Sequence, residues 1–209
     1  MIIYFVRHGT TKGNDTNQYQ KPTISLSEKG RSEAEFLAKR FRDIKLDSIV
    51  SSTMTRALET ANVIARHKDI VVIGSDLFEE IKRPSIVRGK SKDDPESKAI
   101  MKEVKAHFSD SNWSHSDEEN YFLAEKRAAS ALEFILEMKK ERVLVVTHGE
   151  ILQMMLSFII FGEALTPEIF EKIKHVFGTF NTGITKIEHN EMGWYILTWN
   201  DHAHLGEVR

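Results

Sequence analysis

The sequence predicts an α/β protein of three layers (α/β/α), in which helices cover both faces of a mostly parallel central sheet. Two mainly apolar runs, residues 2–6 and 142–146, are short and rich in β-branched residues, which is typical of strands buried on both faces. Each run is followed by a polar residue, a histidine and a glycine. Strand-like and helix-like segments alternate between the two runs, and this order favours parallel strands with right-handed crossovers.

The segments after the first strand follow this alternation in order. Ser27 is the expected N-cap of a helix that ends before Leu46. The apolar face of this helix carries Ala34, Leu37, Ala38 and Phe41, and its polar face carries Glu33, Glu35, Lys39 and Arg40. The next segments predict a strand, a helix and a third strand, at residues 48–50, 54–65 and 70–73.

Residues 76–120 are less regular, and we expect them to form loops and one short helix near residues 98–108. We interpret this segment as an insertion beside the ligand-binding edge of a single domain that spans residues 1–209. The acidic run 117–119 is most simply the first turn of the next helix, where negative charge is favourable.

The last part of the chain returns to regular structure. The predicted elements are a helix at residues 121–140 with Leu123 on its apolar face, the strand 142–146, a helix at 150–161, a short helix opened by Pro167, and an antiparallel hairpin of residues 183–187 and 194–199.

Composition narrows the possible partners. A chain of 209 residues fits one domain, and its net charge of −2 comes from acidic and basic residues that are interspersed along the sequence. No basic stripe suggests nucleic acid or an anionic membrane as a partner. The chain has no cysteine, and its first apolar run is too short for a signal peptide, so we expect a cytoplasmic protein.

Cationic side chains and histidines follow three of the predicted strands. Arg7 and His8 follow the first strand, Arg56 lies one turn into the helix after the second, and His148 follows the strand 142–146. The carboxyl ends of parallel strands meet at one sheet edge, so these four side chains are expected around one pocket. Such a set can hold a phosphoryl dianion, with an imidazole as nucleophile and arginines in place of a metal ion.

Several motifs occur together and in order along the chain. They are Arg7-His8-Gly9-Thr10-Thr11-Lys12-Gly13-Asn14, Leu26-Ser27-Glu28-Lys29-Gly30, Ser51-Ser52 with Arg56-Ala57 and Thr60-Ala61, Val146-Thr147-His148-Gly149, Asn181, and His204-Leu205. With these motifs the chain resembles the histidine phosphatase superfamily, whose fold is phosphoglycerate mutase-like. The resemblance runs from end to end.

The resemblance implies a role for each matching residue. His8 would be the nucleophile that becomes phosphorylated, and the phosphoryl group would be bound by Arg7, Asn14, Arg56 and His148. Glu80 matches the proton donor of the family better than its neighbour Glu79, because an isoleucine follows it. The residues after Ile81 depart from the pattern of many members, so the substrates of those members are not carried over. No cofactor is implied.

The leading hypothesis is a metal-independent phosphomonoesterase that acts through a phosphohistidine on a small phosphorylated metabolite or a phosphoprotein. A mutase of the same chemistry, a non-catalytic domain that binds phosphorylated ligands, and a metallohydrolase remain as alternatives. His202 and His204 are spaced for metal binding on a strand, but this signal is weak because no clear third ligand accompanies them. Arg83, Arg88 and Lys90 are candidates for a second anionic group of the substrate, or a solvated basic loop.

Overall fold

The computed structural model describes residues 1–206, so residues 207–209 of the predicted domain lie outside the described part. Six strands form one sheet in the order β3-β2-β4-β1-β5-β6. Their bounds are β1 Ile2–Arg7, β2 Ser48–Ser51, β3 Val72–Gly74, β4 Arg142–Thr147, β5 Ile184–Asn190 and β6 Gly193–Asp201.

Strand direction divides the sheet into two parts. The strands β3, β2, β4 and β1 are parallel, and β1 pairs with β4 in register from Ile2 opposite Arg142 to Arg7 opposite Thr147. On its other side β1 pairs with β5 antiparallel, and β5 and β6 form the closing hairpin. The predicted α/β class, the mostly parallel sheet and the final hairpin are therefore confirmed.

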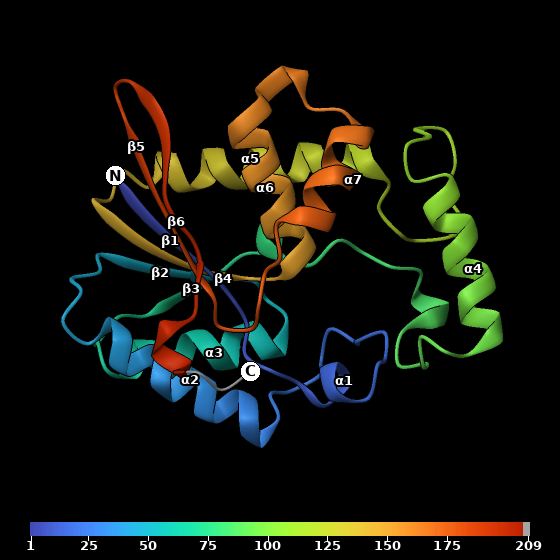
Figure 1. The fold of residues 1–209 in the computed structure, drawn as a ribbon. Helices are drawn as coiled ribbons and strands as arrows, with labels where there is room; N and C mark the ends of the chain where they lie inside the picture. The colour runs from blue at the N-terminus through green and yellow to red at the C-terminus, as the bar shows by residue number, and fades with distance from the viewer. Residues whose placement is uncertain (207–209) are drawn as a thin grey trace.

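Helices cover both faces of the sheet, as Figure 1 shows. The helices α2 (Glu28–Phe41) and α3 (Thr55–Arg66) cover one face, and α5 (Tyr121–Glu137), α6 (Gly149–Phe161) and α7 (Pro167–Val176) cover the other. The side chains of β1 alternate between the two cores: Ile3 and Phe5 pack with α5 and α6, whereas Tyr4 and Val6 pack with α2 and α3. Burial on both faces explains the continuous apolar run of this strand.

Local sequence signals explain where helix α2 begins. Ser27 is its N-cap, and Ser27 Oγ accepts a hydrogen bond from the amide of Gly30 at 3.1 Å, as predicted. One detail of the prediction is wrong, because Glu33 is buried on the inner face of the helix and not on its polar face. Its carboxylate has partners that the helical pattern alone does not reveal.

Several bounds and faces differ from the predictions. The strand β3 is displaced to Val72–Gly74, and a one-turn helix, α1 (Lys12–Asp15), forms where none was predicted. The helix of the irregular segment is α4 (Pro95–Ala106), and it starts early because Pro95 follows the N-cap Asp94. The helix α5 has Asn120 as its N-cap, so the acidic run 117–119 precedes it, and Leu123 is 52% exposed.

None of the helices within residues 1–206 has both the length and the apolar character that a membrane crossing requires.

Candidate active site

A cavity of about 590 Å³ opens at the carboxyl ends of β1 and β4. The predicted site residues that line it are Arg7, His8, Asn14, Arg56 and Glu80. His148 lies directly behind this lining, with its ring centroid 5.0 Å from that of His8. The structure therefore brings together all six residues that the sequence singled out.

His8 is held so that one ring nitrogen is available for chemistry. Nδ1 lies 2.7 Å from the carbonyl oxygen of Gly9, so Nδ1 carries a proton and donates it. Nε2 accepts a hydrogen bond of 3.0 Å from Nε of Arg56 and therefore holds a lone pair. Burial and the charges of Arg56 and Arg7 hold the pKa of His8 well below its ordinary value of 6.5. The ring is neutral near pH 7.

Arg56 makes hydrogen bonds only to uncharged groups within the described part of the chain. Besides His8 these are the carbonyl oxygen of Lys21, at 3.3 Å, and the sulfur of Met54, at 3.2 Å. Burial lowers the pKa of Arg56 to about 10, against the opposing effect of the charge on Glu80. A guanidinium remains protonated at this pKa, so Arg56 brings a buried positive charge to the cavity.

Arg7 and His148 each have a buried nitrogen without a hydrogen-bond partner among residues 1–206. In Arg7 this is Nε, while a terminal nitrogen donates to the carbonyl of Thr179 at 2.6 Å. In His148 it is Nδ1, while Nε2 lies 2.8 Å from Oγ of Ser52. Burial, followed by the charge of Arg56, keeps the pKa of His148 well below 6.5. Unpaired polar groups at this depth are rare, and they are suited to an anionic ligand.

Asn14 lies at the edge of the cavity, on the short helix α1. Its Oδ1 accepts hydrogen bonds from the amide and the hydroxyl of Thr11, at 3.0 and 2.9 Å, which close a capping box. The amide Nδ2 is the group that remains for a ligand. It is a donor, as a phosphate oxygen requires.

The loop after β1 is fixed by close packing and by a buried carboxylate. A Cβ at Gly9 would lie 2.6 Å from the carbonyl oxygen of Gly30, so the loop contacts α2 too closely for any side chain. Glu33 of α2 accepts hydrogen bonds from the amide and the hydroxyl of Thr10, at 2.8 and 2.9 Å. Glu33 thus positions the backbone next to His8, a role that the sequence analysis missed.

Two adjacent glutamates face the cavity from the segment after η1 (Asp76–Phe78). Glu80 lies at the amino end of α6. Its carboxylate accepts hydrogen bonds there from the amides of Ile151, at 3.0 Å, and Glu150, at 3.2 Å. Glu79 turns to Thr53, whose hydroxyl donates to it at 2.6 Å. Glu80 also opposes the lowering of the pKa of Arg56 by burial more strongly than Glu79 does.

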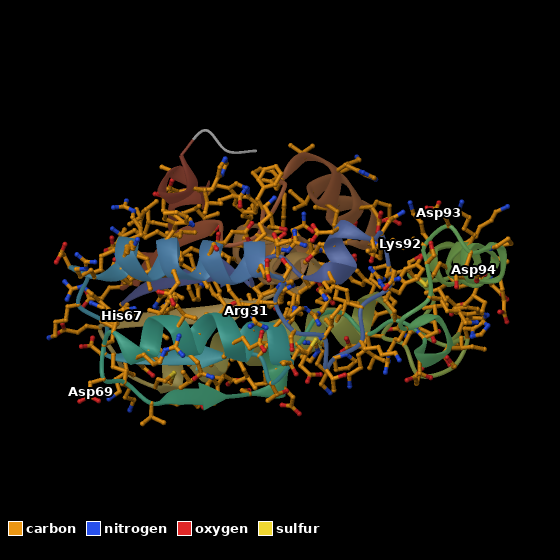
Figure 2. The ribbon with its side chains drawn as sticks, turned by 90° about the horizontal axis from the view of Figure 1, so that it is seen from below. Arg31, His67, Asp69, Lys92, Asp93 and Asp94 are labelled. Atoms are coloured by element: carbon orange, nitrogen blue, oxygen red, sulfur yellow. The ribbon has the colours of Figure 1, made fainter. Side chains whose placement is uncertain are left out.

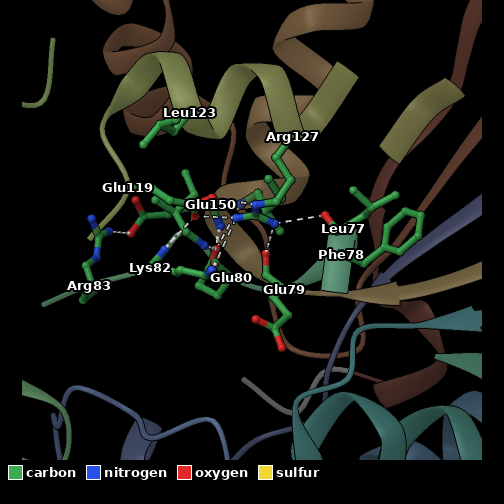
Figure 3. Close-up of polar contacts among 12 residues, drawn as sticks. Leu77, Phe78, Glu79, Glu80, Lys82, Arg83, Glu119, Leu123, Arg127 and Glu150 are labelled. Atoms are coloured by element: carbon green, nitrogen blue, oxygen red, sulfur yellow. Dashed lines mark hydrogen bonds and ion pairs between the residues drawn. The ribbon is translucent and has the colours of Figure 1, made fainter. Parts of the chain in front are cut away.

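Arg127 of α5 holds the segment that carries both glutamates, as Figure 3 shows. Its guanidinium binds Glu119 through two nitrogens, at 2.7 and 2.6 Å, and donates to the carbonyl oxygens of Leu77, at 3.0 Å, and Glu79, at 2.7 Å. The sequence analysis missed this residue. Its spacing from the buried Ala124 and Ala131 places it on an apolar helix face, a position that indicates a paired arginine.

Residues between 82 and 117 form part of the rim of the cavity, and the two arginines among them that line it are paired with carboxylates. Arg83 forms an ion pair with Glu150, and Arg88 donates to Asp117 at 3.0 Å. Lys90 binds Glu96 at 2.8 Å and does not line the cavity, whereas Lys92 does. Figure 2 shows Lys92 between α1 and α4 in that view. Of the three candidates for a second anionic group, the structure places Arg83 and Arg88 at the site and not Lys90.

His202 and His204 do not meet at a shared ligand position. Nδ1 of His202 donates to the carbonyl of Asn200 at 2.9 Å, and Nε2 of His204 lies 3.1 Å from Oγ1 of Thr182. Over residues 1–206, no three histidine, aspartate or glutamate side chains are grouped so that they could hold a metal ion.

Comparison with known proteins decides the family. The model of the histidine phosphatase superfamily (branch 1) matches residues 3–202. The chain belongs to the histidine phosphatase superfamily. This agrees with the motifs on which the resemblance was based.

Proteins that are similar to this chain are named as phosphatases or as phosphoglycerate mutases. A probable phosphatase of Schizosaccharomyces pombe is 28% identical and covers 98% of this chain and 95% of its own. A probable phosphoglycerate mutase of Erwinia tasmaniensis is 24% identical, and the match covers 99% of this chain and 95% of that protein. The solved structure of YhfR from Bacillus stearothermophilus superimposes with a TM-score of 0.82 at 25% identity, covering 98% of both chains.

Proposed function

We propose that the protein is a phosphomonoesterase that transfers the phosphoryl group of its substrate first to His8 and then to water. The observation that carries this proposal is the state of the His8 ring, in which Nδ1 donates to Gly9 and the lone pair of Nε2 meets Arg56 in the cavity. A neutral imidazole with a fixed tautomer is a competent nucleophile toward phosphorus.

In the first step, a bond forms between Nε2 of His8 and phosphorus while the bond from phosphorus to the leaving oxygen breaks. The imidazole gains positive charge, which the carbonyl of Gly9 stabilises at Nδ1. Arg7 and Arg56 neutralise the phosphoryl oxygens, so the charge stabilisation that metal ions give in other phosphoryl transfer enzymes comes from side chains. Asn14 donates through Nδ2.

His148 completes the phosphoryl-binding set as a hydrogen-bond donor. If the hydroxyl of Ser52 donates to Nε2, the proton of the neutral ring resides on Nδ1, the nitrogen without a partner. Nδ1 can then donate to a phosphoryl oxygen. A neutral donor is consistent with the low pKa of this histidine.

Glu80 is the proposed general acid. It gives its proton to the leaving oxygen in the first step, and in the second its carboxylate takes a proton from the water that attacks phosphorus. The bond between phosphorus and Nε2 then breaks, which releases inorganic phosphate and restores His8. The place of Glu80 in the lining of the cavity that His8 also lines supports this role, and the amides of Glu150 and Ile151 hold its carboxylate in position.

Trapping of the covalent intermediate tests the proposal. Wild-type protein that is mixed with a ³²P-labelled phosphomonoester and quenched rapidly without acid should carry label that is labile to acid and stable to base. His8→Ala should carry none and should lose at least about a thousandfold in kcat. Normal turnover by His8→Ala would refute the mechanism.

The same experiment separates the remaining activities. A phosphatase releases the label as inorganic phosphate, whereas a mutase passes it to a second acceptor molecule. Tight binding of the ester without label on His8 would indicate a binding domain. Full loss of activity in a strong chelator, restored by added metal, would indicate a metallohydrolase.

A further inference from the structure

A second cavity, of about 360 Å³, adjoins the candidate active site. It lies between α4 and α7, and it shares Tyr19, Arg83 and Lys92 with the lining of the first cavity. The proposed phosphoryl-binding residues are absent from its lining. A ligand whose phosphoryl group lies at His8 can therefore extend past these three side chains into a space with a different chemical character.

One face of α4 forms an apolar wall of this second cavity. Met101, Val104, Lys105 and Phe108 line it, at the spacing of a single helix face or its immediate continuation. Val104 and Phe108 are buried. Both Lys102 and Lys105 of this helix are exposed, but Lys105 lines the cavity on the face that carries Val104 and Phe108, whereas Lys102 does not line it.

Positive charge is in excess around the apolar wall. Lys174 is neutralised, because it lies 2.9 Å from Glu171 and 3.5 Å from Glu150. Within residues 1–206, neither Lys92 nor Lys105 has a carboxylate within 4 Å. Two lysines without a carboxylate partner beside buried apolar side chains suit a ligand that is apolar along its length and anionic at its end.

We propose that the second cavity binds the leaving group of the substrate, and that this group is an apolar chain or ring ending in a carboxylate or a second phosphate. This inference rests on the proposed phosphatase function and specifies its substrate class. The phosphoryl group lies at His8, the apolar part lies against α4, and the terminal anion lies between Lys92 and Lys105.

Two series of phosphate monoesters test this assignment. One consists of butyl, hexyl and octyl phosphate, and the other of the same esters with a terminal carboxylate. All of them release alkoxides of similar basicity, so differences in kcat/KM report on binding of the leaving group. We expect a rise of up to about fourfold for each methylene that is buried. Each lysine should add a preference of roughly two- to fivefold for the carboxylate.

Charge reversal on α4 provides matched variants. Lys105→Glu should abolish the preference for the terminal carboxylate and favour an ester with a terminal amine. Lys102→Glu makes the same change in charge on the same helix, outside the cavity, and should keep the wild-type ratio. An equal effect of both variants would assign the preference to long-range charge and overturn the site. The site would also be overturned if the kcat/KM of the wild type depended neither on the chain length of the ester nor on its terminal carboxylate.

Binding separates a failure of this inference from a failure of the proposed function. If wild-type protein hydrolyses none of the esters, including phenyl phosphate, the proposed function fails. Calorimetric titration of His8→Ala with the two series of esters still measures how tightly the second cavity binds them. Tighter binding of the carboxylate series, removed by adding Lys105→Glu, supports the site, and equal binding of the two series refutes it.

Discussion

Two pairs of arginines at the same cavity differ in what they bind. Arg7 and Arg56, at the sheet edge, donate to carbonyl oxygens, a histidine nitrogen and a sulfur. Arg83 and Arg88, in the rim, each bind a carboxylate. Of these four arginines Arg56 is buried, at 4% exposed, whereas the other three are half-buried.

The pKa shift of Arg83 has the opposite sign to the shifts of the two inner arginines. Burial lowers the pKa of Arg7 and of Arg56, although nearby glutamates oppose it. For Arg83 burial acts in the same direction, but the charge and hydrogen bond of Glu150, together with the charges of Glu80 and Tyr19, outweigh it and raise the pKa. Within residues 1–206 the inner arginines therefore have no carboxylate hydrogen-bonded to them, whereas Arg83 and Arg88 are already paired with carboxylates.

The largest expected effect comes from Glu80, which precedes the rim segment and is proposed to act at the inner site. Glu80→Gln should slow hydrolysis of alkyl phosphates by about a hundredfold to ten thousandfold, because an alkoxide leaves poorly without a proton. Aryl phosphates, whose phenolates leave unaided, should be affected far less. Steady-state kinetics with both ester classes measures the difference.

Glu79→Gln is the matched control for this prediction, since it changes the neighbouring carboxylate that binds Thr53. It should leave the difference between alkyl and aryl esters as in the wild type. If Glu79→Gln alone shows the selective loss, the acid is Glu79.

The second prediction tests the two arginine pairs directly. Arg56→Ala should lower kcat by about a hundredfold to a thousandfold, because it removes the buried cation that is proposed to contact the phosphoryl group in the transition state. Arg88→Ala removes an arginine that is already paired with Asp117, and for phenyl phosphate it should cost roughly fivefold or less. Similar losses in both variants would contradict the distinction between the inner arginines and the rim arginines.

The third prediction concerns the positioning residue Arg127. Arg127→Lys keeps the charge but loses the fork that binds Glu119 and the carbonyls of Leu77 and Glu79. Displacement of Glu80 should lower kcat for alkyl phosphates by about tenfold to a hundredfold with little change in KM. Aryl phosphates should be nearly unaffected; a loss that is equal for both ester classes would indicate a general structural role instead.

The fourth prediction concerns folding stability below neutral pH. In the folded protein the pKa values of His8 and His148 lie well below 6.5, chiefly because of burial. The unfolded chain binds protons at these residues below about pH 6.5 and the folded protein does not, so acid favours unfolding. The free energy of unfolding should fall by up to about 1.4 kcal/mol per histidine for each pH unit below about 6.5.

Urea denaturation between about pH 7.5 and 5.5 measures this slope. His148→Asn should remove about half of it, since one of the two buried histidines is then absent. Stability that does not change over this range would show that the histidines are not buried as neutral rings.

The parts of the fold that the sequence predicts best are those whose signals are local. The runs around Phe5 and Val145 are buried on both faces, so their apolar character is continuous and their strand assignment is clear. Ser27 likewise caps the adjacent helix. The strand β3 is less predictable, because it is a short strand at the edge of the sheet. Val71, the residue just before it, is 86% exposed although its side chain is apolar. The bounds of β3 depend on pairing with β2.

The residues of the site also differ in how well the sequence predicts their place. Arg7, His8, Arg56 and His148 could be placed together because strand order alone brings them to one edge of the sheet. Glu33, which holds Thr10, and the contacts of Arg127 could not, because they join residues that are distant in the sequence and require the packed helices. Charged residues on an apolar helix face were the available signal.

The backbone contacts between Lys82 and Glu119 bring the two ends of the rim segment together. The amide of Lys82 donates to the carboxylate of Glu119 at 2.9 Å, and the amide of Glu119 donates to the carbonyl of Lys82 at 3.1 Å. The chain between them thus leaves and returns through one narrow neck that Arg127 secures. Loops closed at the neck change length at small entropic cost. An insertion or deletion in an exposed part of this stretch would therefore change the rim of the cavity at small cost and leave both ends of the stretch in place.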